Sequence, residues 1–293
     1  MELVISNLSK TYANGVKALQ DVNLTIPKGM YGLLGPNGAG KSSLMRTIAT
    51  LQEADSGSIM LGDLDVLRNQ TELRKVLGYL PQEFGVYPKI TAYDMLDHIA
   101  LLKGIEKGRK EVVEDLLKRV NLWDVRKKAL GGFSGGMKQR FGIAQALIGD
   151  PKLIIVDEPT AGLDPGERNR FYNLLSEIGE QVIVILSTHI VDDVKELCNQ
   201  MAIIDKGRVL FSGRPDDALN LLRGRIWKKQ VPKQEVIRHQ ELYPVISTRM
   251  VAGKPLVHVY SENNPGDGFD QINGDLEDVF FTYIKGLQMS DVK

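Results

Sequence analysis

A glycine-rich segment at residues 35–42 carries the residue types that hold phosphate groups. It reads Gly-Pro-Asn-Gly-Ala-Gly-Lys-Ser, after an apolar run and before an amphipathic one. Its glycines let successive backbone N–H groups converge on a phosphate chain that a Cβ would keep away. Lys41 supplies a positive charge for the β- and γ-phosphates, and the Ser42 hydroxyl is suited to Mg²⁺. The segment predicts a nucleoside triphosphate site rather than a simple turn, because a strand and a helix flank it.

The residues expected to hold the nucleotide in this segment are its eight members and the serine after them. They are Gly35, Pro36, Asn37, Gly38, Ala39, Gly40, Lys41, Ser42 and Ser43.

Two adjacent carboxylates end a run that is typical of a buried strand. Residues 153–156 are all apolar, and Asp157 and Glu158 follow them directly. Consecutive strand side chains point to opposite faces, so the two acids can do different work. Asp157 is placed to hold Mg²⁺ through water, and Glu158 is placed to orient or deprotonate an attacking water. A strand that merely ends in acidic residues is the alternative, which the phosphate loop disfavours.

A third group is the tripeptide Ser134-Gly135-Gly136, which opens an apolar-faced helical run. Ser134 is suited to cap that helix, and the two glycines leave its N-terminus open to an anion. A plain capping turn would explain the tripeptide in isolation. Placed ahead of Asp150-Pro151 and the acidic strand, however, it resembles the signature motif of ABC-type ATPases.

Further positions resemble motifs of that family in the same order. Tyr12 resembles the aromatic residue that stacks on adenine, although a tyrosine packed on the core is an alternative. Gln82 resembles the glutamine that senses Mg²⁺ and the attacking water. Ala161-Gly162-Leu163-Asp164 resembles the D-loop, and Asp164 is the member expected at the nucleotide. His189 resembles the switch histidine that contacts the γ-phosphate.

The resemblance assigns roles to these residues. It implies catalytic roles for Glu158, His189, Gln82 and Lys41. It implies that Ser42, Gln82 and Asp157 serve Mg²⁺. The departures are small, since Phe133 replaces the usual leucine and Met137 the usual glutamine of the signature.

The resemblance also implies an assembly. Two copies would pair head to tail around two ATP molecules, each held between Lys41 of one copy and the 134–136 signature of the other. Closure of this homodimer would drive a separate polytopic membrane permease, docked near residues 83–88, at the cytoplasmic face of the cell membrane. Residues 137–140 and 276–280 resemble those of exporter ATPases, which favours export.

Composition limits the other classes of partner. Lys plus Arg and Asp plus Glu number 37 each, so no excess charge points to nucleic acid. No apolar stretch approaches the roughly 18 residues that span a bilayer, and the first residues lack the basic region of a signal peptide. The single cysteine, Cys198, is expected to be buried and unreactive.

The elements that must position these residues follow from periodicity. Residues 1–30 alternate as antiparallel strands do, and strands at 76–80, 153–157 and 182–187 alternate with helical runs. Asp164, Pro165 and Glu167 are typical of a helix start. Residues 201–211 indicate a hairpin, and 245–260 alternate around Gly253 in the same way. We expect an α/β fold: a P-loop NTPase (RecA-like) core with an N-terminal antiparallel β subdomain. We expect residues 1–222 to form the ATP-binding domain, with an α-helical subdomain inserted at about 88–150. Residues 225–293 are expected to form a small C-terminal α+β accessory domain.

Three other functions compete with transport. An ABC ATPase acting on ribosomes or DNA would usually carry two cassettes or a long coiled coil, and neither is found here. A small-molecule kinase would have no use for the Ser-Gly-Gly signature. A regulatory subunit that binds ATP without turnover would not need Glu158 and His189.

Overall fold

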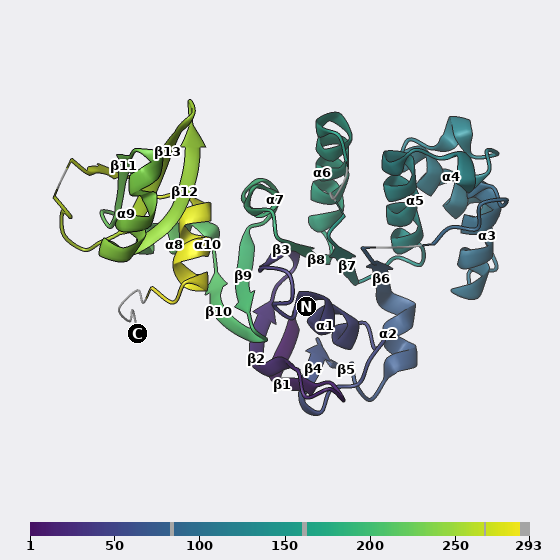
Figure 1. The fold of residues 1–293 in the computed structure, drawn as a ribbon. Helices are drawn as coiled ribbons and strands as arrows, with labels where there is room; N and C mark the ends of the chain where they lie inside the picture. The colour runs from purple at the N-terminus through teal and green to yellow at the C-terminus, as the bar shows by residue number, and fades with distance from the viewer. Residues whose placement is uncertain (83–84, 160–162, 267, 288–293) are drawn as a thin grey trace.

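The structure is a computed structural model that describes residues 1–82, 85–159, 163–266 and 268–287. The chain folds into four parts, and in Figure 1 the helical subdomain and the C-terminal unit lie on opposite sides of the central core. The part of the chain that the structure describes holds no helix long and apolar enough to cross a membrane.

The N-terminal part is an antiparallel sheet, as the alternation predicted. Its strands lie in the order β2 (Lys17–Ile26), β1 (Leu3–Thr11), β4 (Ser56–Leu61) and β5 (Leu64–Asp65). Alternate side chains of β1 and β2 are buried and form one apolar cluster with α1 (Lys41–Ile48).

Several of the predicted site residues lie at the carboxyl ends of strands in the central sheet. Its strands lie in the order β10 (Arg208–Gly213), β9 (Gln200–Asp205), β3 (Gly29–Leu34), β8 (Ile183–Thr188), β7 (Leu153–Asp157) and β6 (Leu77–Leu80). All neighbours pair in parallel except the β9–β10 hairpin. The carboxyl ends of β3, β6, β7 and β8 therefore meet. The phosphate loop, Gln82, the acidic pair and His189 each lie at one of these four ends.

Helices complete this core. α2 (Gln70–Val76) precedes β6, and α6 (Pro165–Gly179) and α7 (Val191–Leu197) flank β8 in sequence. α6 begins where its sequence predicts, because the Asp164 side chain accepts the backbone N–H of Glu167 at 2.9 Å and Pro165 occupies the first turn. Cys198, directly after α7, is buried, and burial raises the pKa of its thiol.

The helical subdomain consists of α3 (Ala92–Leu102), α4 (Arg109–Arg119) and α5 (Gly135–Leu147), with short 3₁₀ turns at Trp123–Val125 and Leu130–Gly132 between α4 and α5. These helices pack on one another and share an apolar cluster with the central sheet. The described elements lie within the expected bounds of about 88–150.

The C-terminal unit is a second antiparallel sheet, in the order β12 (Val245–Val251), β13 (Lys254–Tyr260), β11 (Ile226–Gln230) and β14 (Asp270–Ile272). It also holds α9 (Val236–Leu242) and α10 (Leu276–Ile284), and α8 (Pro215–Leu221) leads into it. One side of the sheet has its own small core around Trp227, Val257 and Phe269. α10 instead packs against α7, α8 and β9, so its apolar side chains join the large core of the cassette (Figure 1).

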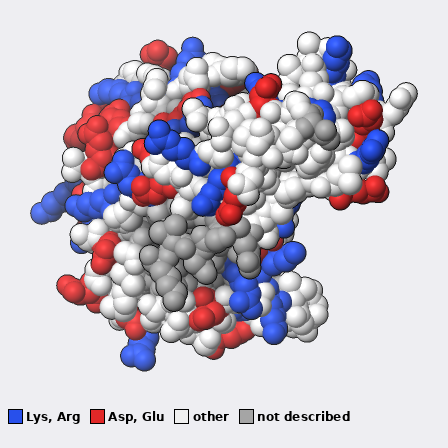
Figure 2. Space-filling view, turned by 90° about the vertical axis from the view of Figure 1, so that its left-hand side faces the viewer, with Lys and Arg blue, Asp and Glu red and all other residues white. Residues whose placement is uncertain are grey.

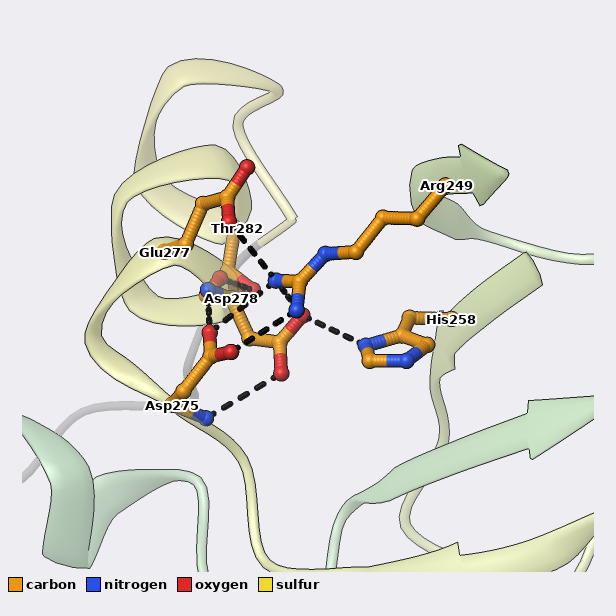
Figure 3. A network of polar contacts seen from close by, with 6 residues as sticks. All are labelled: Arg249, His258, Asp275, Glu277, Asp278 and Thr282. Atoms are coloured by element: carbon orange, nitrogen blue, oxygen red, sulfur yellow. Dashed lines mark hydrogen bonds and ion pairs between the residues drawn. The ribbon is translucent and has the colours of Figure 1, made fainter. Parts of the chain in front are cut away.

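A polar network ties α10 to the sheet (Figure 3). Arg249 of β12 donates to both carboxylate oxygens of Asp275, at 2.8 and 3.1 Å, and lies 3.0 Å from Glu277. The ring of His258 on β13 is 2.8 Å from Asp278, and both side chains are buried. Asp275 and Asp278 also form a reciprocal capping box at the start of α10.

Charges are well mixed on the surface. In the face shown in Figure 2, acidic and basic side chains are interspersed, with no wide area of a single sign. This distribution agrees with the equal numbers of basic and acidic residues in the sequence.

Candidate nucleotide site

A cavity of about 460 Å³ opens at the carboxyl edge of the central sheet. Most of its wall comes from residues 36–43, and the remainder from Tyr12, residues 16–18, Gln82 and Glu158. The cavity therefore joins the predicted phosphate loop, the predicted aromatic residue and two of the predicted catalytic side chains.

The phosphate loop turns tightly from β3 into α1. Gly40 caps α1 with a φ of 108°, in the left-handed region that favours glycine, and a Cβ there would lie 2.5 Å from the carbonyl oxygen of Ala18. α1 begins at Lys41, so its positive N-terminal end lies at the cavity wall. This backbone arrangement is suited to a chain of phosphates.

Lys41 is held inside the loop. Its Nζ donates to the carbonyl oxygens of Gly35 at 2.6 Å and Pro36 at 3.1 Å, and lies 3.6 Å from Glu158 Oε1. Burial lowers the pKa of the Lys41 ammonium, while the carboxylates of Glu158 and Asp157 act in the opposite direction. The charge is thus fixed in place by backbone carbonyls and a carboxylate.

Glu158 is the point where the predicted catalytic side chains meet. Gln82 Nε2 donates to its Oε2 at 3.2 Å, and His189 Nδ1 lies 3.3 Å from its Oε1. With Lys41, three side chains from three different segments surround one carboxylate. The backbone of Glu158 has a φ of 46°, which is uncommon for a residue with a side chain and typical of functional sites.

Asp157 lies deeper than Glu158. It is 4% exposed, and Ser187 Oγ donates to its Oδ1 at 2.6 Å. The predicted magnesium donors are the Ser42 hydroxyl, the Gln82 amide oxygen and the Asp157 carboxylate, and oxygen donors of this kind fit a hard cation that retains waters and phosphate oxygens as ligands. The residues present therefore fit Mg²⁺.

The predicted signature residues lie apart from this cavity. Ser134 caps α5 by accepting the backbone N–H of Met137 at 3.3 Å. Ser134 and Gly135 are exposed, whereas Gly136 is buried against the carboxylate of Glu167. None of the three is among the residues that line the cavity in the described ranges. Within one chain the signature thus takes no part in the wall of the cavity that the phosphate loop forms.

Some predicted residues fall partly outside the described ranges. Asp164 caps α6, but Ala161 and Gly162 of the same motif are not described. Glu83 and Phe84 of the predicted docking segment are not described either, while Tyr87 is 64% exposed. Sequence reasoning missed Gln52, whose side chain contacts Tyr12 and α1.

The comparisons with known proteins agree with this geometry. Residues 19–161 match the family model described as "ABC transporter". The chain is 40% identical over 202 residues to the ABC transporter ATP-binding protein NatA of Bacillus subtilis (strain 168), which covers 68% of this chain and 82% of that protein. The chain belongs to the ATP-binding subunits of ABC transporters.

Two other relatives of this ABC family match longer stretches. The probable multidrug ABC transporter ATP-binding protein YbhF of Escherichia coli (strain K12) is 31% identical over 307 residues, 99% of this chain and 53% of that protein. This chain therefore spans about half the length of that relative. The methionine import ATP-binding protein MetN 1 of Bacillus thuringiensis subsp. konkukian (strain 97-27) is 32% identical over 281 residues, 88% of this chain and 83% of that protein.

Solved structures have the same fold. The ATP-binding subunit of an ABC transporter superposes with a TM-score of 0.68 at 29% identity, covering 75% of this chain and 92% of that one. A dimeric post-hydrolysis state of the ATP-binding cassette MJ0796, bound to ADP and Pi, superposes with a TM-score of 0.66 at 25% identity, covering 72% and 98%. The predicted P-loop fold with its β and helical subdomains is thereby confirmed.

Proposed function

We propose that this chain hydrolyses ATP and that the energy drives a separate membrane permease. The observation that carries the proposal is the convergence of Lys41, Gln82 and His189 on the Glu158 carboxylate beside the phosphate loop. A chain that only bound nucleotide would not need a carboxylate surrounded by these groups at the place where a water would attack.

Each residue then has a defined task. Backbone N–H groups of residues 36–42 and the Lys41 ammonium hold the phosphates. Glu158 orients the attacking water and accepts its proton, and His189 and Gln82 contact the γ-phosphate side of the site. Bound Mg²⁺ would neutralise charge that develops on the phosphates, held by Ser42, Gln82 and Asp157. Catalysis is mainly positioning and electrostatic stabilisation.

The functional unit is a head-to-tail pair of chains. The exposed Ser134 and Gly135, at the N-terminus of α5, are available to the γ-phosphate of a nucleotide bound by a second copy. The dimeric state of the solved cassette bound to ADP and Pi supports this arrangement. Two such contacts form one self-complementary interface, which hydrolysis weakens when the γ-phosphate leaves.

The permease contact lies beside Gln82. Tyr87 and Ile90 are exposed apolar side chains in the short connection between β6 and α3, where a loop would ordinarily be polar. Docking there places the chain at the cytoplasmic face of the membrane. The resemblance of residues 276–280 to exporter ATPases and the multidrug relative that covers 99% of this chain favour export, whereas the methionine import relative represents the opposite direction.

Co-purification from native membranes tests the proposal. The tagged chain, and a K41A variant as a control for nucleotide dependence, would be recovered from detergent-solubilised membranes and their partners identified by mass spectrometry. We expect a polytopic membrane protein whose presence stimulates phosphate release by the unmodified chain. Recovery of ribosomal or DNA-repair proteins without a permease would overturn the transport function and leave the ATPase.

A further inference from the structure

The hydroxyl group of Tyr12, a residue that lines the nucleotide cavity, is hydrogen-bonded to side chains in and just after α1. The Tyr12 oxygen lies 2.9 Å from Ser43 Oγ and donates to Gln52 Oε1 at 3.0 Å. Ser43 belongs to the first turn of α1, and Gln52 follows the end of that helix. The aromatic ring is therefore linked to the helix whose N-terminus faces the phosphates.

The hydrogen-bonding partners fix the orientation of the Gln52 amide. Its Nε2 donates to the Ser43 carbonyl oxygen at 2.9 Å and is 2.8 Å from Thr47 Oγ1. Thr47 Oγ1 also donates to the Ser43 carbonyl, at 2.8 Å. Because both acceptors lie on the Nε2 side, Oε1 is directed at the Tyr12 hydroxyl.

The Tyr12 hydroxyl donates one hydrogen bond and accepts another within the protein. A phenol has one proton to donate, which goes to Gln52, so the Ser43 hydroxyl donates to the Tyr12 oxygen. The Tyr12 side chain also lines the cavity, so its ring is available to a ligand there. A ring face stacks on any nucleic base, because every base has a π-face, and it reads no hydrogen-bonding pattern.

We infer that Gln52 is a positioning residue: through the Tyr12 hydroxyl it holds the Tyr12 ring in the cavity, against the base of the nucleotide. The inference rests on the proposed nucleotide function. Gln52 acts through Tyr12 on the base, rather than through Ser43 and Thr47 on the phosphate loop. These two routes predict different losses of binding affinity for ligands that carry a base and for ligands that do not.

Equilibrium binding of three ligands separates the routes. ATP, GTP and inorganic tripolyphosphate, which has phosphates and no base, would be titrated into the unmodified chain, Q52L and Y12F. Losing one hydrogen-bonded support is expected to weaken ATP and GTP binding about two- to ten-fold and to a similar extent. Tripolyphosphate affinity should stay unchanged in both variants. Gln271, which donates to the Gly224 carbonyl in the C-terminal unit, offers the matched control Q271L.

A double variant tests whether Gln52 and Tyr12 act together. Q52L added to Y12F should weaken ATP binding no further, because the same contact has already been lost. Equal loss of tripolyphosphate affinity, or additive losses in the double variant, would each overturn the inference. If Q52L does not fold, the affinities of Y12F for ATP and for tripolyphosphate decide the inference. Failure of the unmodified chain to bind ATP at all would instead overturn the proposed function.

Discussion

Glu158 has a backbone conformation that residues with a side chain rarely adopt. Its left-handed φ turns the chain directly after the buried strand β7, and the side chain meets Lys41, Gln82 and His189. A conformation of this kind costs free energy and persists where the surroundings fix it. Here the surroundings are the side chains that we assign to catalysis.

The variant E158Q tests the role of this carboxylate. A glutamine keeps the size and one acceptor oxygen but cannot take a proton, so turnover should fall at least about a hundred-fold while ATP affinity is retained. Phosphate release and equilibrium ATP binding would be measured on the same preparation. Turnover near that of the unmodified chain would remove Glu158 from its assigned role.

The variant K41A tests the phosphate site separately. It removes a buried charge that Gly35 and Pro36 hold in place, so ATP binding itself should weaken by ten-fold or more, about 1.4 kcal/mol per factor of ten. Tripolyphosphate binding should fall in parallel, because the lost contact is to phosphate. An unchanged affinity for both ligands would contradict the assignment of residues 35–42.

At the residue scale, the site could be predicted wherever a motif is continuous in sequence. The phosphate loop and the acidic pair each follow one strand, and parallel strands bring their carboxyl ends to one edge. Gln52 could not be found in this way, because its partner Tyr12 is 40 residues away. A contact of that range depends on how α1 packs against the N-terminal sheet, which periodicity does not determine.

At the scale of elements, α10 is the link between the C-terminal unit and the cassette. Its first turn, with Asp275 and Glu277, lines a pocket of about 320 Å³ together with His189 and Asp192. The polar network in Figure 3 attaches the same turn to β12 and β13. α10 therefore lies between the C-terminal strand β12 and α7, the helix that follows His189.

The variant R249M tests this attachment. It leaves Asp275, Glu277 and the buried Asp278 without the guanidinium, and we expect the free energy of unfolding to fall by about 1–2 kcal/mol, allowing for partial exposure. Amide hydrogen exchange in α10 should increase. Arg238, exposed on α9, provides the control R238M, which should leave both measurements unchanged.

The same attachment has a defined dependence on pH. Burial raises the pKa of Asp275, but the hydrogen bonds from Arg249 and from the Asp278 backbone N–H, together with the Arg249 charge, outweigh burial, and the net pKa lies below its ordinary value of 3.8. A carboxyl group with a lowered pKa stabilises the fold above that ordinary value and loses the contribution as pH falls through the lowered one. The difference in stability between R249M and the unmodified chain should thus shrink below about pH 4. A constant difference would contradict the ion pair.

Elements were predicted unequally along the chain. The Asp164–Pro165–Glu167 start of α6 and the β9–β10 hairpin followed from local signals and are confirmed. In the C-terminal unit the β12–β13 hairpin was predicted, but β11 and β14 were not, because their pairing joins residues far apart in sequence. The division into 1–222 and 225–293 stays a prediction.

At the scale of the whole molecule, the proposed head-to-tail pair would bring the signature, which does not line the cavity of its own chain, to the nucleotide of a second copy. With E158Q, ATP should persist at the interface and shift the chain from monomer to dimer in analytical ultracentrifugation, whereas ADP should not. The substitution G135R would place a bulky cation in the signature and should abolish the shift without weakening ATP binding to the monomer. ATP-independent dimerisation that G135R leaves intact would contradict the head-to-tail arrangement.

The burial of Cys198 has a practical consequence. It is the sole cysteine of the sequence, and its buried thiol with a raised pKa is a poor nucleophile. A cysteine introduced at an exposed position such as Lys127 would therefore react selectively with a spin label, with no need to remove the native thiol. Because a symmetric pair carries two identical labels, one pulsed electron-spin measurement would yield the distance between helical subdomains during turnover.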